Sequence, residues 1–172
     1  SLPNGTVLGI DNSKGMLESA TQKFDDQVKL GSLKFELNDV MELDYPDNTF
    51  DAIFMAYGIR NMPDYEKCLK NLKRILKPGG VICFHEYSLS NNLFAKLYWK
   101  ILGYGVIIPI AGIISGSTKI YSYLIKSVLS FPSPNKFLEK LNTAGFDKVK
   151  RYAQPSWRRP ILHTFIAYKP QK

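Results

Sequence analysis

FDAIFMAYGIRNMPDYEKCLKNLKRILKPGGVICFHEY, residues 50–87, is the stretch that decides the fold class of this chain. It opens with the apolar run 50–57 and closes with a second run at 81–87, and short apolar runs of this kind predict buried strands. Between them, residues 64–76 place apolar side chains on one side at helical spacing, and the PGG triplet at 78–80 ends that helix. A strand, a helix and a strand in this order predict an α/β fold with a mainly parallel sheet.

The same alternation extends toward the N-terminus. Residues 7–10 form a short apolar run that ends at Asp11, and residues 33–37 alternate between apolar and polar side chains. Both patterns predict strands. A helix is expected between them, beginning after Ser13, because serine is a favourable N-cap.

Toward the C-terminus, residues 134–144 predict a helix that stops at Gly145. Residues 146–152 and 161–168 predict two strands joined by a turn-rich link, which we expect to form an antiparallel pair at the sheet edge. We therefore expect one domain over residues 1–172.

Residues 89–130 interrupt this alternation. Residues 101–118 carry no charge, and their length approaches that of a membrane span. Four glycines and a proline break up the run, and a single helix of that composition would be kinked and would propagate weakly. We expect a helical insertion that packs partly on the domain and partly exposes an apolar wall, with a core helix as the alternative. Lys96 and Lys100 lie among aromatic and apolar residues, a pattern typical of a helix at a membrane surface.

Charge is divided unevenly along the 172 residues, whose net charge is +8. Residues 1–88 carry 10 basic against 13 acidic residues, and residues 89–172 carry 13 against 2. A basic half can attract nucleic acid, an anionic membrane or an acidic ligand. The basic residues are scattered and show no aromatic-basic RNA motif, so we expect no nucleic-acid partner. A peripheral contact with an anionic membrane and a merely solvated basic surface are the two alternatives that the sequence leaves open.

The cysteines, histidines and N-terminus restrict the class of protein further. Two cysteines cannot form a disulfide framework, and the first five residues do not resemble a signal peptide. These features favour a cytoplasmic protein in a reducing compartment. The two histidines, His85 and His163, have no metal-ligand spacing, so we expect no metal site.

Three candidate functional positions follow predicted strands. Ligands of open α/β sheets bind beyond the carboxyl ends of the strands. Asp11 could accept hydrogen bonds from the two hydroxyls of a ribose, and Asp39 could accept one from the amine of an adenine. The loop at 56–61 could face both a cofactor and a substrate. Each aspartate could instead be an ordinary turn or helix cap.

These positions coincide with motifs of a known family. Residues 9–20, GIDNSKGMLESA, resemble the second strand and following helix of class I methyltransferases that use S-adenosyl-L-methionine. Residues 37–80 resemble the central stretch of the ubiquinone/menaquinone biosynthesis C-methyltransferases, through the PDNTFD turn, the YGIRN loop and the RILKPGG helix end. The resemblance covers nearly the whole chain. It implies a Rossmann-like methyltransferase sheet with a helical insertion.

The resemblance implies a cofactor site for S-adenosyl-L-methionine. Asp11 would bind the ribose, while Asp39 and Val40 would flank the adenine and Met16 would pack nearby. Ala56 stands where relatives often have a serine that contacts the cofactor.

For the acceptor, the resemblance implies a lipid-soluble quinol whose ring carbon is methylated. Arg60 and Asn61 would be the catalytic residues facing the ring, with Arg60 stabilising a phenolate. Tyr57, Glu86 and Tyr121 would bind the acceptor.

One family feature does not occur in the sequence. The glycine-rich loop after the family's first strand would precede Ser1, so we expect a fragment or truncated product whose cofactor binding is weak and whose first strand is missing. The alternatives are a methyltransferase of the same fold acting on another small molecule or lipid, and a non-catalytic remnant. The oligomeric state is left open, and a homo-oligomer is compatible with the sequence.

Overall fold

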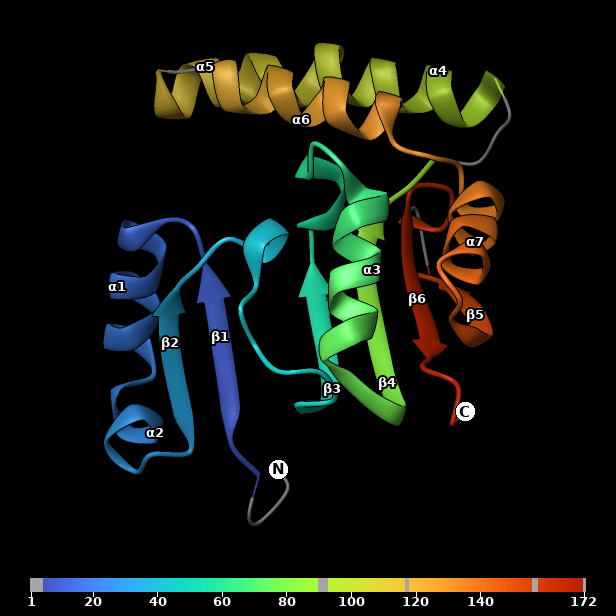
Figure 1. Ribbon diagram of the computed structural model, residues 1–172. Coiled ribbons are helices and arrows are strands. Elements are labelled where there is room, and N and C mark those ends of the chain that lie inside the picture. The colour runs from blue at the N-terminus through green and yellow to red at the C-terminus, as the bar shows by residue number, and fades with distance from the viewer. Residues whose placement is uncertain (1–4, 90–92, 117, 156–157, 172) are drawn as a thin grey trace. The chain divides into compact units, whose positions relative to one another are not determined.

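The computed structural model describes residues 5–89, 93–116, 118–155 and 158–171 (Figure 1). The chain forms two compact units, Ser1–Tyr45 and Pro46–Lys172.

The first unit contains a parallel two-stranded sheet. Its elements are β1 (Val7–Asp11), α1 (Lys14–Lys23), α2 (Asp25–Lys29), β2 (Leu33–Leu37) and the 3-10 turn η1 (Val40–Glu42). β1 pairs with β2 so that Asp11 lies opposite Leu37. Ser13 caps α1, since its hydroxyl accepts a hydrogen bond from the Met16 backbone N–H at 3.4 Å. The predicted strand, capped helix and strand are therefore confirmed.

The second unit contains a four-stranded sheet in the order β3-β4-β6-β5. Its elements are β3 (Phe50–Ala56), the 3-10 turn η2 (Ile59–Asn61), α3 (Tyr65–Ile75), β4 (Leu76–Tyr87), α7 (Pro134–Thr143), β5 (Asp147–Ala153) and β6 (Leu162–Tyr168). β3 and β4 are parallel, whereas β6 is antiparallel to both β4 and β5. The antiparallel pair predicted at the sheet edge is confirmed.

β4 begins five residues earlier than the predicted strand. α3 ends at Ile75, before the PGG triplet is reached, and the triplet lies within β4, where its backbone pairs across the sheet. Gly79 donates to the Lys169 carbonyl at 2.9 Å, and Lys169 donates to the Gly80 carbonyl at 3.0 Å. Gly79 has a φ of +76°, a left-handed conformation that favours glycine.

Helices α3 and α7 supply much of the core. The Asp64 side chain caps α3 by accepting from the Lys67 N–H at 2.9 Å. The apolar face of α3 is buried through Cys68, Leu69, Leu72 and Ile75. From α7, the Phe137 ring lies 5.6 Å from that of Phe84 on β4 and 4.9 Å from that of Phe165 on β6. This packing holds the sheet rigid beneath the loops at its end.

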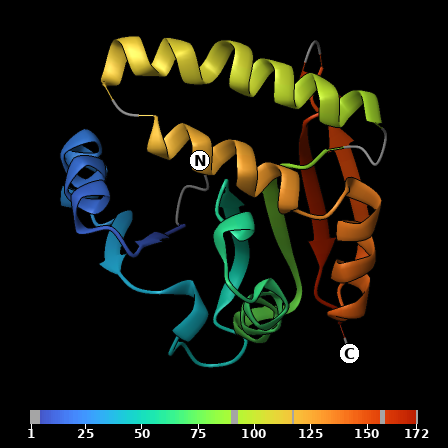
Figure 2. The same ribbon diagram turned by 90° about the horizontal axis from the view of Figure 1, so that it is seen from above.

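Residues 93–116 and 118–130 form a helical hairpin. Its first arm is α4 (Leu93–Leu102), a π-helical segment η3 (Gly103–Ile107) and α5 (Ile108–Ser115), and its second arm is α6 (Lys119–Ser130). Figures 1 and 2 show α4 and α5 in line, with α6 running beside them. The run is not broken into separate helices, since Leu93–Ile114 is continuously helical, and Gly103 and Gly105 lie in the π segment. By length and composition alone this helix could cross a membrane.

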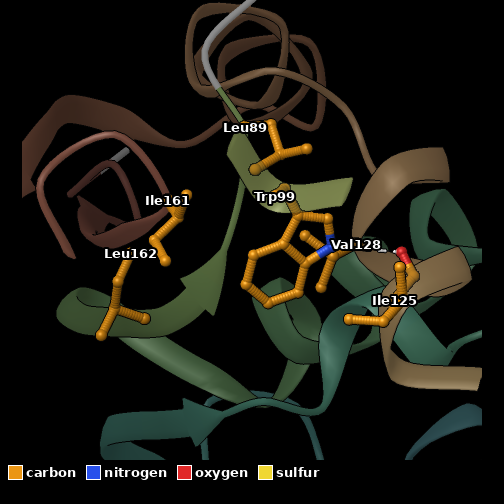
Figure 3. Close-up of a cluster of buried hydrophobic side chains, with 6 residues drawn as sticks. All are labelled: Leu89, Trp99, Ile125, Val128, Ile161 and Leu162. Carbon is orange, nitrogen blue, oxygen red and sulfur yellow. Dashed lines mark hydrogen bonds between the residues drawn. The ribbon is translucent and has the colours of Figure 1, made fainter. Parts of the chain in front are cut away.

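A buried cluster attaches the hairpin to the sheet (Figure 3). It consists of Leu89, Trp99, Ile125, Val128, Ile161 and Leu162, and is called the Trp99 cluster below. The indole N–H of Trp99 donates to the Ile125 carbonyl at 3.3 Å. At Gly103 a Cβ atom would lie 2.4 Å from Ile125 Cδ1, so glycine permits the close approach of the two arms. Through this cluster the helices of the hairpin pack on the four-stranded sheet of the second unit.

Candidate functional site

In the first unit, Asp11 and Asp39 lie at the same end of the parallel sheet. Asp11 is the last residue of β1, and Asp39 follows the end of β2 by two residues. The backbone N–H of Asn38 donates to the Asp11 carbonyl at 3.1 Å, which ties the two strand ends together. Both aspartates therefore lie where the sequence places them, each at the carboxyl end of a strand.

Each of these aspartates also stabilises a turn. Asp11 Oδ1 accepts from the Ser13 N–H and Asp39 Oδ1 accepts from the Met41 N–H, both at 2.8 Å. Within the described residues no hydrogen bond is made by the Oδ2 atom of either carboxylate. The capping interpretation is thus correct, and it leaves one oxygen on each side chain for a ligand.

The other two predicted cofactor contacts of this unit lie beside that rim. Val40 is half-buried and begins η1 directly after Asp39. Met16 lies in the first turn of α1 with 62% of its surface exposed. The first unit thus carries an exposed thioether and two carboxylate oxygens that are available to a ligand.

In the second unit, the loop after β3 is centred on a buried ion pair. Arg60 Nη1 lies 2.5 Å from Glu86 Oε1, and the two side chains are 8% and 0% exposed. The Arg60 backbone N–H points at Glu86 Oε2 at 3.5 Å. The loop is anchored by Ile59, which is buried. Arg60 is therefore not in a surface salt bridge, because its charge is neutralised inside the protein.

Three further contacts fix the guanidinium of Arg60. Nη1 donates to the Tyr57 carbonyl at 3.0 Å, and Nε donates to Ser127 Oγ on α6 at 3.3 Å. Its Cζ lies 5.9 Å from the centre of the Tyr87 ring. No acceptor for Nη2 is found in the described part of the chain. The Arg60 side chain is thus held by β4, by its own loop and by α6, and the N–H groups of Nη2 remain available as hydrogen-bond donors.

Glu86 is held as firmly as its partner. Besides Arg60, its Oε1 atom accepts from the Tyr87 backbone N–H at 2.8 Å. Burial raises the pKa of the Glu86 carboxyl above its ordinary value, although the charge and hydrogen bonds of Arg60 act in the opposite direction. In this arrangement the carboxylate faces Arg60.

The aromatic side chains around the pair form one wall. The Tyr57 ring lies 5.4 Å from the His85 ring and 5.2 Å from the Tyr87 ring. Tyr57 keeps 39% of its surface exposed, and partial burial raises the pKa of its phenol. Its φ of +55° is uncommon for a residue with a side chain, and such conformations concentrate at functional sites. Ala56, just before it, ends β3 and is exposed.

Helix α6 completes the arrangement. Asn61 donates through Nδ2 to the Tyr57 carbonyl at 3.0 Å, and its Oδ1 accepts from the Tyr123 hydroxyl at 3.2 Å. Tyr121, the tyrosine expected at the acceptor, is half-buried on the same helix. Ser127 and Tyr87 were not expected at the site. The four-residue spacing of Tyr123 and Ser127 was the available signal, since it places both on one helical face.

The two histidines lie on neighbouring strands of the four-stranded sheet, His85 on β4 and His163 on β6. His85 Nδ1 lies 2.9 Å from Thr164 Oγ1 across the sheet. His163 is buried, and this burial, with a smaller effect of the Arg151 charge, lowers its pKa to about 4. Among the described residues no group of three or more metal-ligating side chains occurs.

Solved structures share this fold. One neighbour is a SAM-dependent methyltransferase from Aquifex aeolicus, with a TM-score of 0.62 and 19% identity, covering 97% of this chain and 70% of that chain. Another is phosphoethanolamine N-methyltransferase 2 from Haemonchus contortus, bound to S-adenosylhomocysteine, with a TM-score of 0.68 and 18% identity, covering 97% and 44%. These likenesses confirm the Rossmann-like methyltransferase fold.

Sequence relatives are more similar. The chain is 37% identical over 159 residues to a ubiquinone/menaquinone biosynthesis C-methyltransferase, UbiE, of Rickettsia bellii, covering 92% of this chain and 63% of that protein. It is 36% identical over 149 residues to the mitochondrial 2-methoxy-6-polyprenyl-1,4-benzoquinol methylase of Bos taurus, covering 87% and 45%. The chain thus spans less than two thirds of the length of these relatives. The model of one family matches residues 2–165, almost the whole chain. The chain therefore belongs to the ubiE/COQ5 methyltransferase family.

Proposed function

We propose that this chain provides the cofactor rim and the acceptor site of an S-adenosyl-L-methionine-dependent methyltransferase that methylates a ring carbon of a prenylated quinol. Membership of the ubiE/COQ5 methyltransferase family supports the reaction class. The single observation that carries the acceptor site is the buried pair of Arg60 and Glu86. A buried arginine with donors still available suits an acceptor that must become anionic to react.

The residues at the rim fit the cofactor. The free oxygen of Asp11 suits the ribose hydroxyls, and the free oxygen of Asp39 suits the adenine amine. Val40 and Met16 would supply apolar surface for the adenine. In the second unit, Ala56 has no polar side chain, so any cofactor contact that it makes would be through its backbone. When bound, S-adenosyl-L-methionine supplies an electrophilic methyl group on a sulfonium.

Arg60 has the central part in the acceptor site. A ring carbon of a quinol becomes strongly nucleophilic when an adjacent hydroxyl loses its proton. The Nη2 donors of Arg60 would stabilise the resulting phenolate oxygen. The proton displaced from the ring carbon passes to water, because an arginine side chain stays charged and is a poor base.

The neighbouring residues position Arg60 or contact the ring. Asn61 and the exposed part of Tyr57 would lie against the ring, and Tyr121 would line the path of the tail. We assign Glu86 an indirect role at the acceptor: it positions Arg60, because both of its carboxylate oxygens face Arg60.

A methyl-transfer assay tests this function. The protein is incubated with S-adenosyl-L-methionine and a demethylated prenyl quinol, and the mass of the product is measured by mass spectrometry. We expect a mass gain of one methyl group, and loss of most of that product in Arg60→Gln. Arg74→Gln is the matched control, because Arg74 forms an exposed pair with Asp47 at 2.9 Å.

The outcomes separate the alternatives. Methylation of simple phenols or other lipids without methylation of quinols would reassign the acceptor and keep the reaction class. Folded protein that binds the cofactor and methylates none of these acceptors would refute the proposal.

A further inference from the structure

We propose that the outer face of the first hairpin arm, Leu93–Ile114, binds the surface of an anionic lipid bilayer and lies in its interfacial layer. This inference goes beyond the proposed reaction, because it concerns a surface that makes no contact with Arg60 or the aspartates among the interactions described above. It can be tested without methyl transfer.

The arm exposes a continuous apolar face. In α4 and the start of the π segment, the exposed side chains are spaced by three or four residues and include adjacent pairs, which places them on one side of a helix. They are Leu93, Phe94, Leu97, Tyr98, Ile101 and Tyr104. In α5 the face continues through Ile110, Ile113 and Ile114, the last two being 86% and 80% exposed. Apolar surface of this extent marks a binding site for an apolar partner.

The opposite side of the same arm is attached to the protein. Ala95, Trp99 and Gly103, four residues apart, are buried, and Trp99 belongs to the cluster that joins the arm to α6 and β6. A helix held along one side cannot be surrounded by lipid. The arm is therefore suited to lie in the membrane surface with only its outer face in the lipid, although its length would allow it to span a membrane.

Charge around the arm favours anionic lipid. Residues 87–138 contain five lysines and no aspartate or glutamate. Lys96 and Lys100 lie on the arm itself, next to its apolar face, and Lys119 begins the second arm. Lysines bordering an apolar helical face reach lipid headgroups while their carbon chains stay near the apolar layer.

The same charges argue against a second copy of this chain as the occupant. Two copies meeting through this face would bring lysines of equal sign together, and the segment has no acidic residue to pair with them. A bilayer with anionic headgroups satisfies both the apolar face and its lysines.

Vesicle flotation with the whole chain tests the proposal. The probes are phosphatidylcholine vesicles with and without phosphatidylglycerol, at low and moderate salt. We expect binding to the anionic vesicles that weakens with salt. Ile113→Asp and Phe94→Asp should each weaken the binding by about tenfold or more, because a charge replaces a side chain buried in lipid. Lys96→Gln should weaken it by about fivefold, and only on anionic vesicles.

Leu30→Asp is the matched control, because Leu30 is 81% exposed in the first unit, away from the hairpin in sequence. It should bind vesicles as the parent does, and circular dichroism should show that every variant is folded. The proposal is overturned if the parent does not float with anionic vesicles, or if Ile113→Asp and Leu30→Asp bind equally. Light scattering that shows a dimer lost only in Ile113→Asp, without vesicle binding, would assign the face to a second copy instead. The conclusions from vesicle binding and light scattering do not depend on whether the protein transfers a methyl group.

Discussion

Replacing Arg60 by methionine should destabilise the protein, because the buried Glu86 carboxylate would lose its cationic partner. Glu86 is fully buried, and Arg60 is its only cationic partner among the described residues. Removing one member of a buried ion pair costs about 3–5 kcal/mol, because the other charge remains without compensation. The exposed pair of Arg74 and Asp47 provides the comparison, and Arg74→Met should cost about 1 kcal/mol or less.

The loss of stability in Arg60→Met should depend on pH. The pKa of Glu86 is already raised by burial, and losing Arg60 removes the largest opposing influence. The folded variant then binds a proton more tightly than the unfolded chain does. Its stability should fall as pH rises from the ordinary pKa of glutamate through the raised folded value, and the deficit should shrink as pH is lowered. Arg74→Met should show no such trend, since its partner is exposed.

Urea denaturation at several pH values measures both effects. The double variant Arg60→Met with Glu86→Leu should recover much of the lost stability because no buried charge remains. The reasoning is refuted if Arg60→Met costs no more than Arg74→Met, or if the double variant is less stable than Arg60→Met alone.

Three further predictions concern other parts of the molecule. Gly103→Ala should destabilise the hairpin by about 1–3 kcal/mol in urea denaturation, because its Cβ would meet a buried isoleucine at 2.4 Å. Gly105→Ala, which meets nothing within 4 Å, should be neutral or stabilising. Asp11→Asn and Asp39→Asn each keep the Oδ1 acceptor of the turn but lose the negative charge. Calorimetry should therefore show about tenfold weaker binding of S-adenosyl-L-methionine by each variant, with unchanged stability. Binding equal to that of the parent would exclude the rim as the cofactor site. His163 has a pKa lowered to about 4, so its folded form binds fewer protons than the unfolded chain and stability should be lost as pH falls from about 6.5 through 4. His163→Leu should remove that part of the acid sensitivity, and an unchanged pH profile would contradict it.

The alternation of strands and helices was predictable because its signals are local. The apolar runs at 50–57 and 81–87, the helical spacing at 64–76 and the capping Ser13 each act within a few residues of the chain. The shared rim of Asp11 and Asp39 followed from topology, since parallel neighbouring strands end on the same side.

Features that depend on distant residues were not predictable in the same way. The early start of β4 depends on backbone bonds to Lys169, about ninety residues away in sequence. The sequence marked Arg60 and Glu86 as separate acceptor contacts, but their pairing across 26 positions needed the sheet. Ser127 was missed because serines on helices are common and only the fold brings its hydroxyl to Arg60.

Helix α6 joins the two surfaces on which the proposals rest. On one face, Tyr123 bonds Asn61 and Ser127 bonds Arg60. On another, Ile125 and Val128 belong to the Trp99 cluster, which holds the outer arm.

A quinol whose tail remains in the bilayer must present its ring at a fixed depth. The rigid packing of α6 between the outer arm and the Arg60 loop would set that depth. A change that loosens α6 from the arm, such as a larger residue at Gly103, should therefore impair methylation of a prenylated quinol more than methylation of a tail-less analogue. Equal losses on the two acceptors would show that α6 serves the loop alone.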